Sequence, residues 1–575
     1  MVVGWSMKCA EARWVLAPPP DQAAAVALAS ALALPMPLAQ LLVARGHAAD
    51  ASARRYLRPD LEHLADPLLM ADMQVAVDRL SAAITKGEMI LVHGDYDVDG
   101  MASTALMTRS LRALGAQVSP FIPDRQRDGY DLGPAGVEAA IRVRAGVVLT
   151  CDCGTTAVQA AIDLAAAGID LIISDHHLPG PTLPIALAIL NPRRADDTSP
   201  DKDLAAVGVA FKLAMALTRA MGGNVNVVLN QLDLVALATV ADVAPLRGEN
   251  RVFVRRGLAL MRETKNLGLR ALLRSSGLDG KEITAGRVGF NLAPRLNALG
   301  RVDRALLGVD LLLAERDEDA LALARHCEER NRERQELNTG ILDEVMRRVE
   351  ALDLGATWGI ALADESWHPG VIGIVASRVV EQTGRPTFLV SVRDGVGKGS
   401  GRSIPGFDLH SALGQCTDLL IRHGGHKAAA GLTIDATRMD EFAVRFNSVA
   451  RERLTPEDLK RTLHVDLELS LADATSDLEK LLRNFEPFGI GNPGPIFVAR
   501  GVPVAGSVSK IGADGVKCLI EAPSGPVEAV GWGLAHRAAE LRLGARIDLA
   551  YRIERNVFRG TERLQLAIVD FRPAA

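Results

Sequence analysis

The chain has 575 residues, with 65 Lys and Arg against 70 Asp and Glu, which gives a formal net charge of −5 at pH 7. Hydrophobic residues make up 48% and charged residues 23% of the sequence, which excludes disordered, collagen-like and disulfide-scaffold proteins. The acidic balance argues against a protein that coats nucleic acid with its whole surface, because such proteins are usually basic. The length allows roughly three or four domains.

Residues 1–69 are predicted to form a small helical segment. The apolar run Ala23–Leu34 follows acidic residues and is broken by Pro35 and Pro37, so it is too short for a membrane span. The cysteines are scattered and form no CxxC pair, which favours a reducing compartment. We therefore expect a cytoplasmic protein without a membrane partner.

Residues 70–315 are predicted to be an α/β domain. The runs MILVHGDYDVDG, AGVVLTCDCG, IDLIISDHH and IALAILNP each read as a buried strand that ends in polar residues, with helical patterns between them. Buried parallel strands joined by crossover helices form a doubly wound sheet, and ligands bind at the carboxyl ends of its strands. The stretch from about 203 to 315 is predicted to be mostly helical.

Three further segments follow. Residues 316–355 are polar and helix-favouring and are expected to form a long connecting helix. Residues 356–457 return to an α/β pattern and are predicted to be a second, substrate-binding domain. Residues 458–575 contain about five short strand-like runs, which suit a small β-barrel of the oligonucleotide-binding (OB) type.

Carboxylates and imidazoles gather at the predicted strand ends. The residues concerned are His93, Asp95, Asp97 and Asp99 after the first strand, Asp152 after the second, Asp175, His176 and His177 after the third, and Asp242 after an apolar helix. The first four share one face of an extended segment or crown its end. So many carboxylates at one edge need a counter-charge, and mixed carboxylate and imidazole ligands suit a pair of Mn²⁺ or Mg²⁺ ions.

Eight sequence motifs carry a resemblance to a known family. GDYDVDG, CDCGTT, SDHH and VADVAP stand in the order of the motifs of the DHH phosphoesterase superfamily. Beyond them, NLAPRLNALGR (291–301), WHPGVIGIVASR (367–378), KGSGRS (398–403) and GGHKAAAG (424–431) resemble the RecJ family within it. The likeness extends from about residue 70 to the C-terminus, so the second α/β domain is expected to be of the DHHA1 type.

The resemblance implies a metal-dependent exonuclease that degrades single-stranded DNA from its 5′ end to mononucleotides in DNA repair and recombination. By position, two divalent ions, Mn²⁺ or Mg²⁺, would be held by His93, Asp97, Asp99, Asp152, His176 and Asp242. Asp152 would bridge the ions, and His177 would face the scissile phosphate as a hydrogen-bond donor. Asp97, Asp99, Asp152 and His177 are thus the candidate catalytic residues, with Asp95 and Asp175 expected to orient the ligands.

Two positions depart from the family pattern. Cys151 and Cys153 flank Asp152, and small buried side chains are a better interpretation of them than metal ligation, because thiolates prefer softer ions. Gly129-Tyr130-Asp131 stands where the family shows GYG. This change leaves the expected metal site intact but puts the role of that loop in doubt.

Basic charge is concentrated locally. Residues 251–304 carry twelve Lys and Arg against four Asp and Glu, a local excess that suits the neutralisation of phosphates. The candidate DNA- or phosphate-binding residues are Arg125, Arg295, Arg301, Ser400, Arg402 and His426. Ser400, Arg402 and His426 lie in glycine-rich turns, where backbone N–H groups can approach a phosphate.

Two other functions remain open at this stage. One is a hydrolase of short oligonucleotides or small phosphoesters from the same superfamily, and the terminal barrel counts against it. The other is a non-catalytic DNA-replication scaffold, and the intact ligand set counts against it. The expected partner is single-stranded DNA with a 5′ end. Single-strand-binding protein and a helicase are candidate protein partners of an expected monomer.

Overall fold

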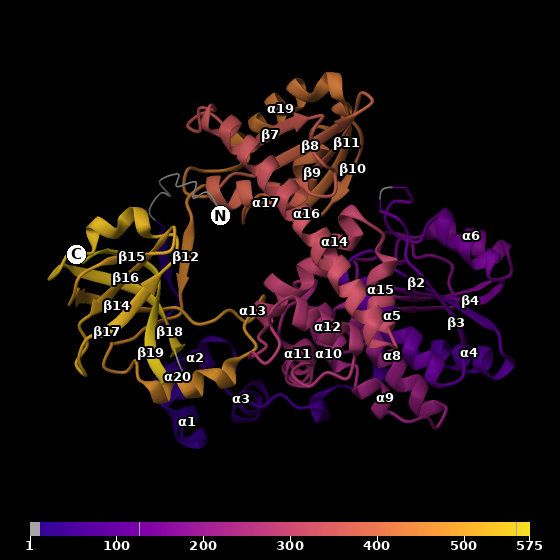
Figure 1. The fold of residues 1–575 in the computed structure, drawn as a ribbon, viewed down its shortest axis with the longest axis horizontal. Coiled ribbons are helices and arrows are strands. Elements are labelled where there is room, and N and C mark those ends of the chain that lie inside the picture. Colours follow the sequence, from indigo (N-terminus) through magenta and orange to yellow (C-terminus); the bar gives the residue numbers. More distant parts are fainter. Residues whose placement is uncertain (1–11, 126, 559–560, 575) are drawn as a thin grey trace. The chain divides into compact units, whose positions relative to one another are not determined.

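A computed structural model describes residues 12–125, 127–558 and 561–574 of the chain (Figure 1). The chain divides into two compact units. One, the catalytic unit below, combines Arg58–Arg334 with the short segment Glu486–Pro493. The other contains the residues up to Leu57, Gln335–Phe485 and the residues from Gly494 onward. Among the described residues, no helix is both long and apolar enough to cross a membrane.

The catalytic unit contains a parallel sheet with the strand order β3-β2-β4-β5-β6. The strands are β2 (Met89–Gly94), β3 (Gln117–Phe121), β4 (Ala145–Cys151), β5 (Asp170–Ser174) and β6 (Ala188–Leu190). The crossover helices are α5 (Val98–Ala113), α6 (Pro134–Arg142) and α7 (Val158–Ala166), and α4 (Met73–Lys86) precedes β2. This arrangement confirms the predicted doubly wound sheet.

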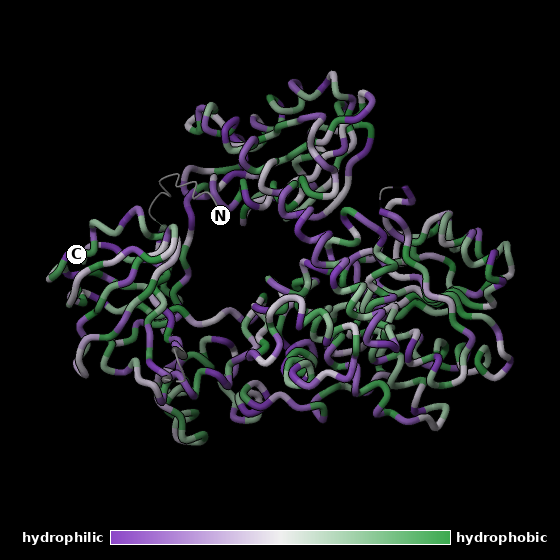
Figure 2. Tube along the Cα trace, viewed as in Figure 1, coloured by the Kyte–Doolittle hydropathy of each residue, from purple (hydrophilic) through white to green (hydrophobic). Residues whose placement is uncertain are grey.

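The sheet is buried on both faces. In β2, Ile90 and Val92 join a large core with α5, whereas Leu91 joins a separate core with α6 and α7. Neighbouring residues of a strand point to opposite faces, so a continuous apolar run is what two covered faces require. The tube of Figure 2 accordingly has hydrophobic colouring along these strands.

Helices complete the catalytic unit, as predicted for the stretch from about 203 to 315. They are α8 (Ala206–Ala220), α9 (Asn226–Leu229), α10 (Leu232–Ala241), α11 (Gly248–Met261), α12 (Leu267–Ser275), α13 (Ala285–Arg287), α14 (Ala293–Val302) and α15 (Leu306–Leu313), with a π-helical turn η3 (Val288–Leu292) before α14. The predicted long helix is α16 (Asp317–Glu350).

The segment after α16 is a second α/β domain with the strand order β10-β11-β9-β8-β7. Its elements are β7 (Ile360–Asp364), α17 (Ile372–Thr383), β8 (Thr387–Arg393), β9 (Val396–Arg402), α18 (Leu409–Gly414), β10 (Leu420–Gly425), β11 (Ala429–Asp435) and α19 (Met439–Arg453). Phe442 and Phe446 of α19 pack on Phe388 of β8, while Leu389 of β8 packs into a separate core with α17.

The C-terminal region forms one seven-stranded sheet, ordered β13-β14-β18-β19-β17-β16-β15. The strands are β13 (Leu467–Glu468), β14 (Phe497–Pro503), β15 (Ser509–Ile511), β16 (Gly515–Ile520), β17 (Val527–Gly531), β18 (Arg546–Phe558) and β19 (Thr561–Pro573), and helix α20 (Ser476–Leu482) precedes β14. The predicted barrel had about five strands, and the additional ones are two or three residues long, too short for a periodic signal.

The N-terminal residues belong to the same unit as this sheet. β1 (Arg13–Leu16) pairs in parallel with β12 (Thr462–Val465), and the Trp14 indole donates a hydrogen bond of 2.8 Å to Asp570. Three helices follow, namely α1 (Gln22–Leu32), α2 (Met36–Ala44) and α3 (Asp50–Leu57). The first of them covers most of the apolar run Ala23–Leu34, in the segment that was predicted to be helical.

Candidate functional site

The loop between β2 and α5 carries three carboxylates in a tight turn. The strand ends at Gly94, and Asp97 caps the following helix by accepting hydrogen bonds from the backbone N–H of Asp99 (2.8 Å) and Gly100 (3.1 Å). A Cβ on Gly100 would lie 2.3 Å from the Asp95 carbonyl oxygen, so only glycine fits there. The alternation of an extended strand therefore stops before the carboxylates begin.

Asp99 reaches from α5 to the first turn of α8. Its carboxylate accepts hydrogen bonds from the N–H groups of Ala206 (2.8 Å) and Val207 (2.9 Å) and is fully buried. Burial and the nearby charge of Asp97 raise the pKa of Asp99 to about 7.

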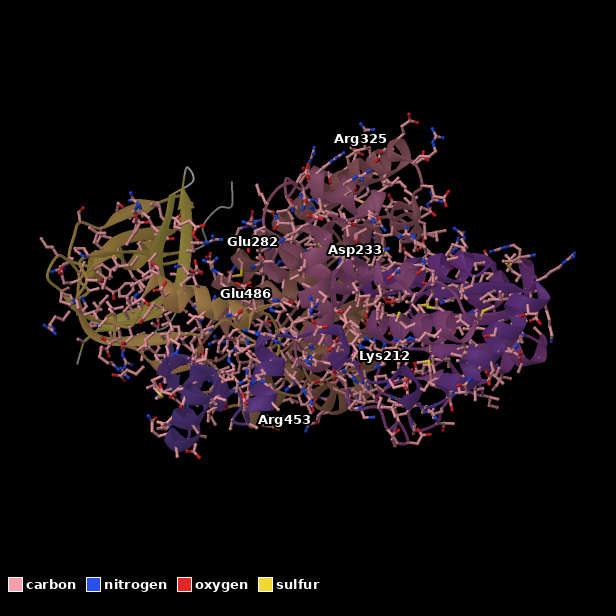
Figure 3. The ribbon with its side chains drawn as sticks, turned by 90° about the horizontal axis from the view of Figure 1, so that it is seen from below. Lys212, Asp233, Glu282, Arg325, Arg453 and Glu486 are labelled. Atoms are coloured by element: carbon pink, nitrogen blue, oxygen red, sulfur yellow. The ribbon has the colours of Figure 1, made fainter. Side chains whose placement is uncertain are left out.

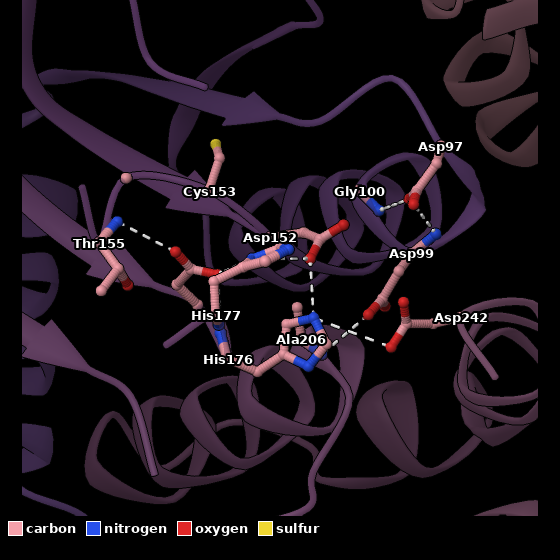
Figure 4. A network of polar contacts seen from close by, with 12 residues as sticks. Asp97, Asp99, Gly100, Asp152, Cys153, Thr155, His176, His177, Ala206 and Asp242 are labelled. Carbon is pink, nitrogen blue, oxygen red and sulfur yellow. Dashed lines mark hydrogen bonds and ion pairs between the residues drawn. The ribbon is translucent and has the colours of Figure 1, made fainter. Parts of the chain in front are cut away.

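Asp152 and His176 follow the next two strands. Asp152 has a φ of 68°, in the left-handed region, and such strain is found mostly at functional positions. Nε2 of His176 lies 3.3 Å from Oδ1 of Asp152 and 3.8 Å from Oδ2 of Asp242 (Figure 4). Its Nδ1 is 3.1 Å from the Leu204 carbonyl oxygen, which leaves Nε2 directed into the carboxylates.

The ligand atoms form three groups in the described part of the chain, each within 4.8 Å: Asp95, Asp97 and Asp152; Asp99, His176 and Asp242; and Asp152, His176 and His177. Asp152 and His176 each belong to two groups, which suits neighbouring ions. Four polar atoms of the predicted site residues are buried without a hydrogen-bond partner, namely Oδ1 of Asp95, Oδ1 of Asp152, Nε2 of His93 and Nε2 of His176. Buried polar atoms are normally paired, so these four fit bound cations.

The pKa values of the clustered residues also favour bound cations. Burial, followed by neighbouring carboxylate charges, raises the pKa of Asp152 and of Asp95 well above the ordinary value. Burial and the charge of His177 lower the pKa of His176 to about 4, so its imidazole is neutral, the form that binds metals. His176 therefore adds no positive charge to offset the carboxylates.

His93 is not brought into any of these groups. A Cβ on Gly136 of α6 would lie 2.7 Å from Nε2 of His93, and its Nδ1 is 3.4 Å from Sγ of Cys153. Nδ1 of His93 is thus held by Cys153, while its Nε2 is buried without a hydrogen-bond partner and remains available to a metal ion. Asp95, expected only to orient ligands, stands in the group with Asp97 and Asp152.

His177 lies at the centre of a hydrogen-bonded relay. Its Nδ1 is 2.7 Å from Oδ1 of Asp175, and its Nε2 is 3.1 Å from the hydroxyl of Tyr130. Burial lowers the pKa of His177, but the hydrogen bond and charge of Asp175 outweigh it and raise the pKa to about 9. The imidazole is thus a cation near neutral pH. Sequence reasoning missed Tyr130, although the loop that carries it was noted.

The two departures from the family pattern have structural explanations. Asp131 has a φ of 76° and accepts hydrogen bonds from the N–H of Gly154 (2.7 Å) and the hydroxyl of Thr156 (2.7 Å), so it fixes the turn after Asp152. Cys151 and Cys153 are fully buried, and burial raises the pKa of both thiols, which keeps them protonated. Both cysteines therefore pack as small side chains.

Helix α14 supports the carboxylate loop from outside. The N–H of Val98 donates to Oδ1 of Asn297 at 3.3 Å. A Cβ on Gly300 would lie 2.0 Å from the carbonyl oxygen of Tyr96. The motif 291–301 had been noted for its arginines, whereas Asn297 and Gly300 give it a second role in holding the loop.

We expect Gly300→Ala to displace the loop at Tyr96 and to weaken Mn²⁺ binding about tenfold, the usual cost of disturbing the groups that orient metal ligands. Isothermal titration calorimetry measures this affinity directly. Gly340→Ala in α16 is the matched control, because its Cβ would meet nothing within 4 Å. Equal Mn²⁺ affinities of the two variants would refute a supporting role for α14.

Two of the three predicted phosphate-binding arginines of the catalytic unit adjoin the carboxylate loop. The guanidinium of Arg125 lies 4.7 Å from the centre of the Tyr96 ring. Burial raises the pKa of Tyr96 to about 12, and the charges of Arg125 and Arg301 act against this rise. Arg295 is instead half-buried and paired with Glu328 at 2.5 Å, which favours a structural role.

The basic stretch 251–304 is partly neutralised within the fold. Five of its twelve basic residues pair with carboxylates, namely Arg256, Arg262, Arg270, Arg274 and Arg295. The positive charge that this stretch can offer to phosphates is therefore smaller than the count along the sequence indicates.

Ser400 and Arg402 lie side by side in the second α/β domain. They are two residues apart on β9, and Nη1 of Arg402 donates to Oγ of Ser400 at 3.2 Å. A Cβ on Gly373, in the first turn of α17, would lie 2.8 Å from Oγ of Ser400 and 3.1 Å from Nη2 of Arg402. A serine, an arginine and a helix N-terminus together suit a phosphate. Gly373 was missed, although its motif was quoted.

His426 lies in the exposed hairpin between β10 and β11, where its N–H donates to the Ala429 carbonyl at 2.8 Å. Ala429 pairs with Arg402 in the sheet, so this hairpin stands at the strand end that carries Ser400 and Arg402. The structure thus brings these three predicted residues together in one domain, and the carboxylates with Arg125 and Arg301 in the other unit.

The parallel sheet with acidic strand ends and an Asp-His-His turn defines a DHH-type phosphoesterase fold. Residues 89–239 match the DHH family, N-terminal domain, residues 355–452 match the DHHA1 domain, and residues 465–570 match the RecJ OB domain. The chain belongs to the RecJ family of this superfamily.

Relatives of known identity support this assignment. The chain is 38% identical to the single-stranded-DNA-specific exonuclease RecJ of Bacillus subtilis over 568 residues, which cover 98% of this chain and 71% of the relative. It is 35% identical to the RecJ of Escherichia coli, with 88% and 91% covered. The crystal structure of Thermus thermophilus RecJ with Mn²⁺ superposes with a TM-score of 0.84 at 32% identity, covering 98% of this chain and 80% of that one. The corresponding structure with Mg²⁺ has a TM-score of 0.79 at 30% identity, covering 98% and 79%.

Proposed function

We propose that this chain is a metal-dependent exonuclease that degrades single-stranded DNA from its 5′ end to mononucleotides in DNA repair and recombination. The observation that carries the proposal is the buried carboxylate and imidazole cluster, whose unpartnered atoms and raised carboxylate pKa values call for cations. The same chemistry suits Mn²⁺ and Mg²⁺, the ions in the related structures.

The residues that would hold two divalent ions are His93, Asp97, Asp99, Asp152, His176 and Asp242, with Asp95 beside Asp97 and Asp152 as a further carboxylate. Asp152 would bridge the ions in this assignment. His93 is included because its buried Nε2 has no hydrogen-bond partner, whereas its Nδ1 meets Sγ of Cys153. When bound, such ions polarise the phosphate and lower the pKa of a water molecule toward neutrality.

His177 acts on the scissile phosphate as a cationic hydrogen-bond donor. Asp175 holds its Nδ1 and keeps the ring protonated, so Nε2–H is available to a phosphate oxygen that gains charge in the transition state. The hydroxyl of Tyr130 accepts from this Nε2 until the phosphate takes its place. Arg125 and Arg301 bind DNA phosphates in the catalytic unit, and Ser400, Arg402 and His426 do so in the DHHA1-type domain.

The proposal also covers the setting of the reaction. The enzyme acts in the cytoplasm as a monomer on single-stranded DNA with a 5′ end, which a helicase and a single-strand-binding protein would supply. The C-terminal OB domain supports this substrate, because such domains bind single strands.

An assay with 5′-labelled single strands, duplex DNA and dinucleotides in Mn²⁺ tests the function. We expect release of labelled mononucleotides from the single strand and little cleavage of the duplex. A preference for dinucleotides would support a short-oligonucleotide hydrolase, and inactivity on every substrate would support a scaffold.

The pH dependence of stability tests the metal site independently of activity. Burial and the Asp97 charge raise the pKa of Asp99 from 3.8 to about 7, so its contribution to stability is present below about pH 4 and lost as the pH rises through about 7. We therefore expect the cluster to make the metal-free chain more stable at about pH 5 than at about pH 8.

Saturating Mn²⁺ should remove this loss and add about 2.7 kcal/mol at a free concentration 100 times the dissociation constant. Thermal unfolding with chelator and with Mn²⁺ measures both effects. An unfolding temperature that does not respond to Mn²⁺ at either pH would contradict the site.

A further inference from the structure

The segment Glu486–Pro493, called the linker segment below, belongs to the catalytic unit, although Phe485 and Gly494 on either side of it belong to the other unit. Its first residue, Glu486, is labelled in Figure 3. None of the metal or phosphate contacts described above uses it.

The linker segment docks on residues that closely follow a metal ligand. The N–H of Leu246 donates to the Ile490 carbonyl at 2.7 Å. A Cβ on Gly491 would lie 2.9 Å from Cβ of Pro245, and a Cβ on Gly489 would lie 2.7 Å from Cδ1 of Leu246. The glycines thus permit a close approach that other residues would block.

The linker segment has an ordered internal structure. Gly489 and Asn492 exchange backbone hydrogen bonds of 2.9 and 3.1 Å, and the buried side-chain amide of Asn492 donates to the Pro487 carbonyl at 2.7 Å. From α11, Nη1 of Arg255 donates to the carbonyl of Glu486 at 3.4 Å. The linker segment is therefore ordered enough to fix the positions of Pro245 and Leu246, which it contacts.

The backbone between Asp242 and the docking point is under strain. Val243 has a φ of 61°, which is a rare conformation for a β-branched residue and persists only where the surroundings enforce it. The hydrogen bond at Leu246 lies four residues after Asp242 and is one of the contacts that enforce it.

A buried asparagine extends this support to other ligands. Nδ2 of Asn250 donates to the carbonyls of Pro245 (3.2 Å) and Asp203 (2.6 Å). Its Oδ1 accepts from the N–H of Ala205 at 3.4 Å. The two neighbours of Ala205 contact predicted metal ligands. The Leu204 carbonyl meets Nδ1 of His176, and the N–H of Ala206 donates to the carboxylate of Asp99.

We propose that the linker segment is a positioning element of the metal site, which holds Asp242 through Pro245 and Leu246 and holds Asp99 and His176 through Asn250. The inference rests on the proposed function, because it assigns the segment to the geometry of that metal site. It also means that the chain leading into the OB domain takes part in building the catalytic centre.

Gly491→Ala in the full-length chain tests the proposal. The added Cβ should push Pro245 away and weaken Mn²⁺ binding about tenfold in titration calorimetry without DNA, with kcat lowered and KM for DNA little changed. Gly533→Ala is the matched control: the two glycines have φ values of 73° and 74°, but a Cβ on Gly533 meets nothing within 4 Å. The control carries the same backbone strain without the contact.

Gly489→Ala is a second test, and it adds no left-handed strain because the φ of Gly489 is not positive. Its added Cβ would meet the movable end of the Leu246 side chain. Gly414→Ala is the control for this variant, because a Cβ on Gly414 would meet nothing within 4 Å. Thermal unfolding identifies the variants that remain folded. If Gly491→Ala does not fold, the Mn²⁺ affinity of Gly489→Ala decides the test. Mn²⁺ affinities equal to those of the controls overturn the inference. Absence of Mn²⁺ binding by the wild-type chain overturns the proposed function instead.

Discussion

Asp152→Ala is expected to abolish cleavage while leaving DNA binding intact. Asp152 contributes to two of the three ligand groups, so its loss removes the bridge between neighbouring ions. Metal ions supply several kcal/mol of transition-state stabilisation, so a rate decrease of at least about 10³-fold follows. Release of mononucleotides from a 5′-labelled single strand measures cleavage, and fluorescence anisotropy with the same strand measures binding.

Asp163→Ala provides the control for this variant, because Asp163 is an exposed carboxylate of α7 in the same unit. It should cleave at the wild-type rate. Retained cleavage by Asp152→Ala would refute the metal assignment, whereas loss of both cleavage and binding would indicate that Asp152 acts on the fold.

Asp175→Asn is expected to lower kcat about 10²-fold at neutral pH and to change its pH dependence. In the wild type the hydrogen bond and charge of Asp175 outweigh burial and hold the pKa of His177 at about 9, so kcat should fall as the pH rises through that value. Without the carboxylate, burial dominates and the pKa falls. The descending limb of the profile then moves to lower pH.

The measurement is kcat across the pH range for the wild type, Asp175→Asn and the control Asp163→Asn. His177→Ala should lose a similar factor in kcat and show no descending limb from this group. A profile of Asp175→Asn that descends at the wild-type pH would contradict a cationic role for His177.

Periodicity and turn chemistry predicted the parallel sheet and placed most of the site. Asp152 and His176 follow neighbouring strands of one parallel sheet, whose carboxyl ends meet at one edge, and Asp242 follows the buried helix α10. The long helix α16 followed from a polar stretch without proline in the same way.

The grouping of Asp95 with Asp97 and Asp152 was beyond the sequence. Alternation along an extended chain does not fix where β2 ends, and this end sets the turn that carries Asp95. The supporting groups Asn297, Gly300 and Asn250 were missed for a related reason. Their contacts join residues that are distant in the sequence, and neither composition nor spacing encodes such contacts.

The count of basic residues in 251–304 overestimated the charge that is available to phosphates, for a different reason. Counting along the chain does not show which arginines meet carboxylates, and Arg262, for example, pairs with Glu282 on the far side of helix α12. The net charge of −5 is better explained by the acidic metal site, since two divalent ions would offset most of it.

Anomalous scattering from Mn²⁺ in crystals of this chain tests the central claim most directly. The account predicts two Mn²⁺ ions, one among Asp95, Asp97 and Asp152 and the other among Asp99, His176 and Asp242, with Asp152 touching both. A single ion elsewhere, or no ion at these carboxylates, would contradict it.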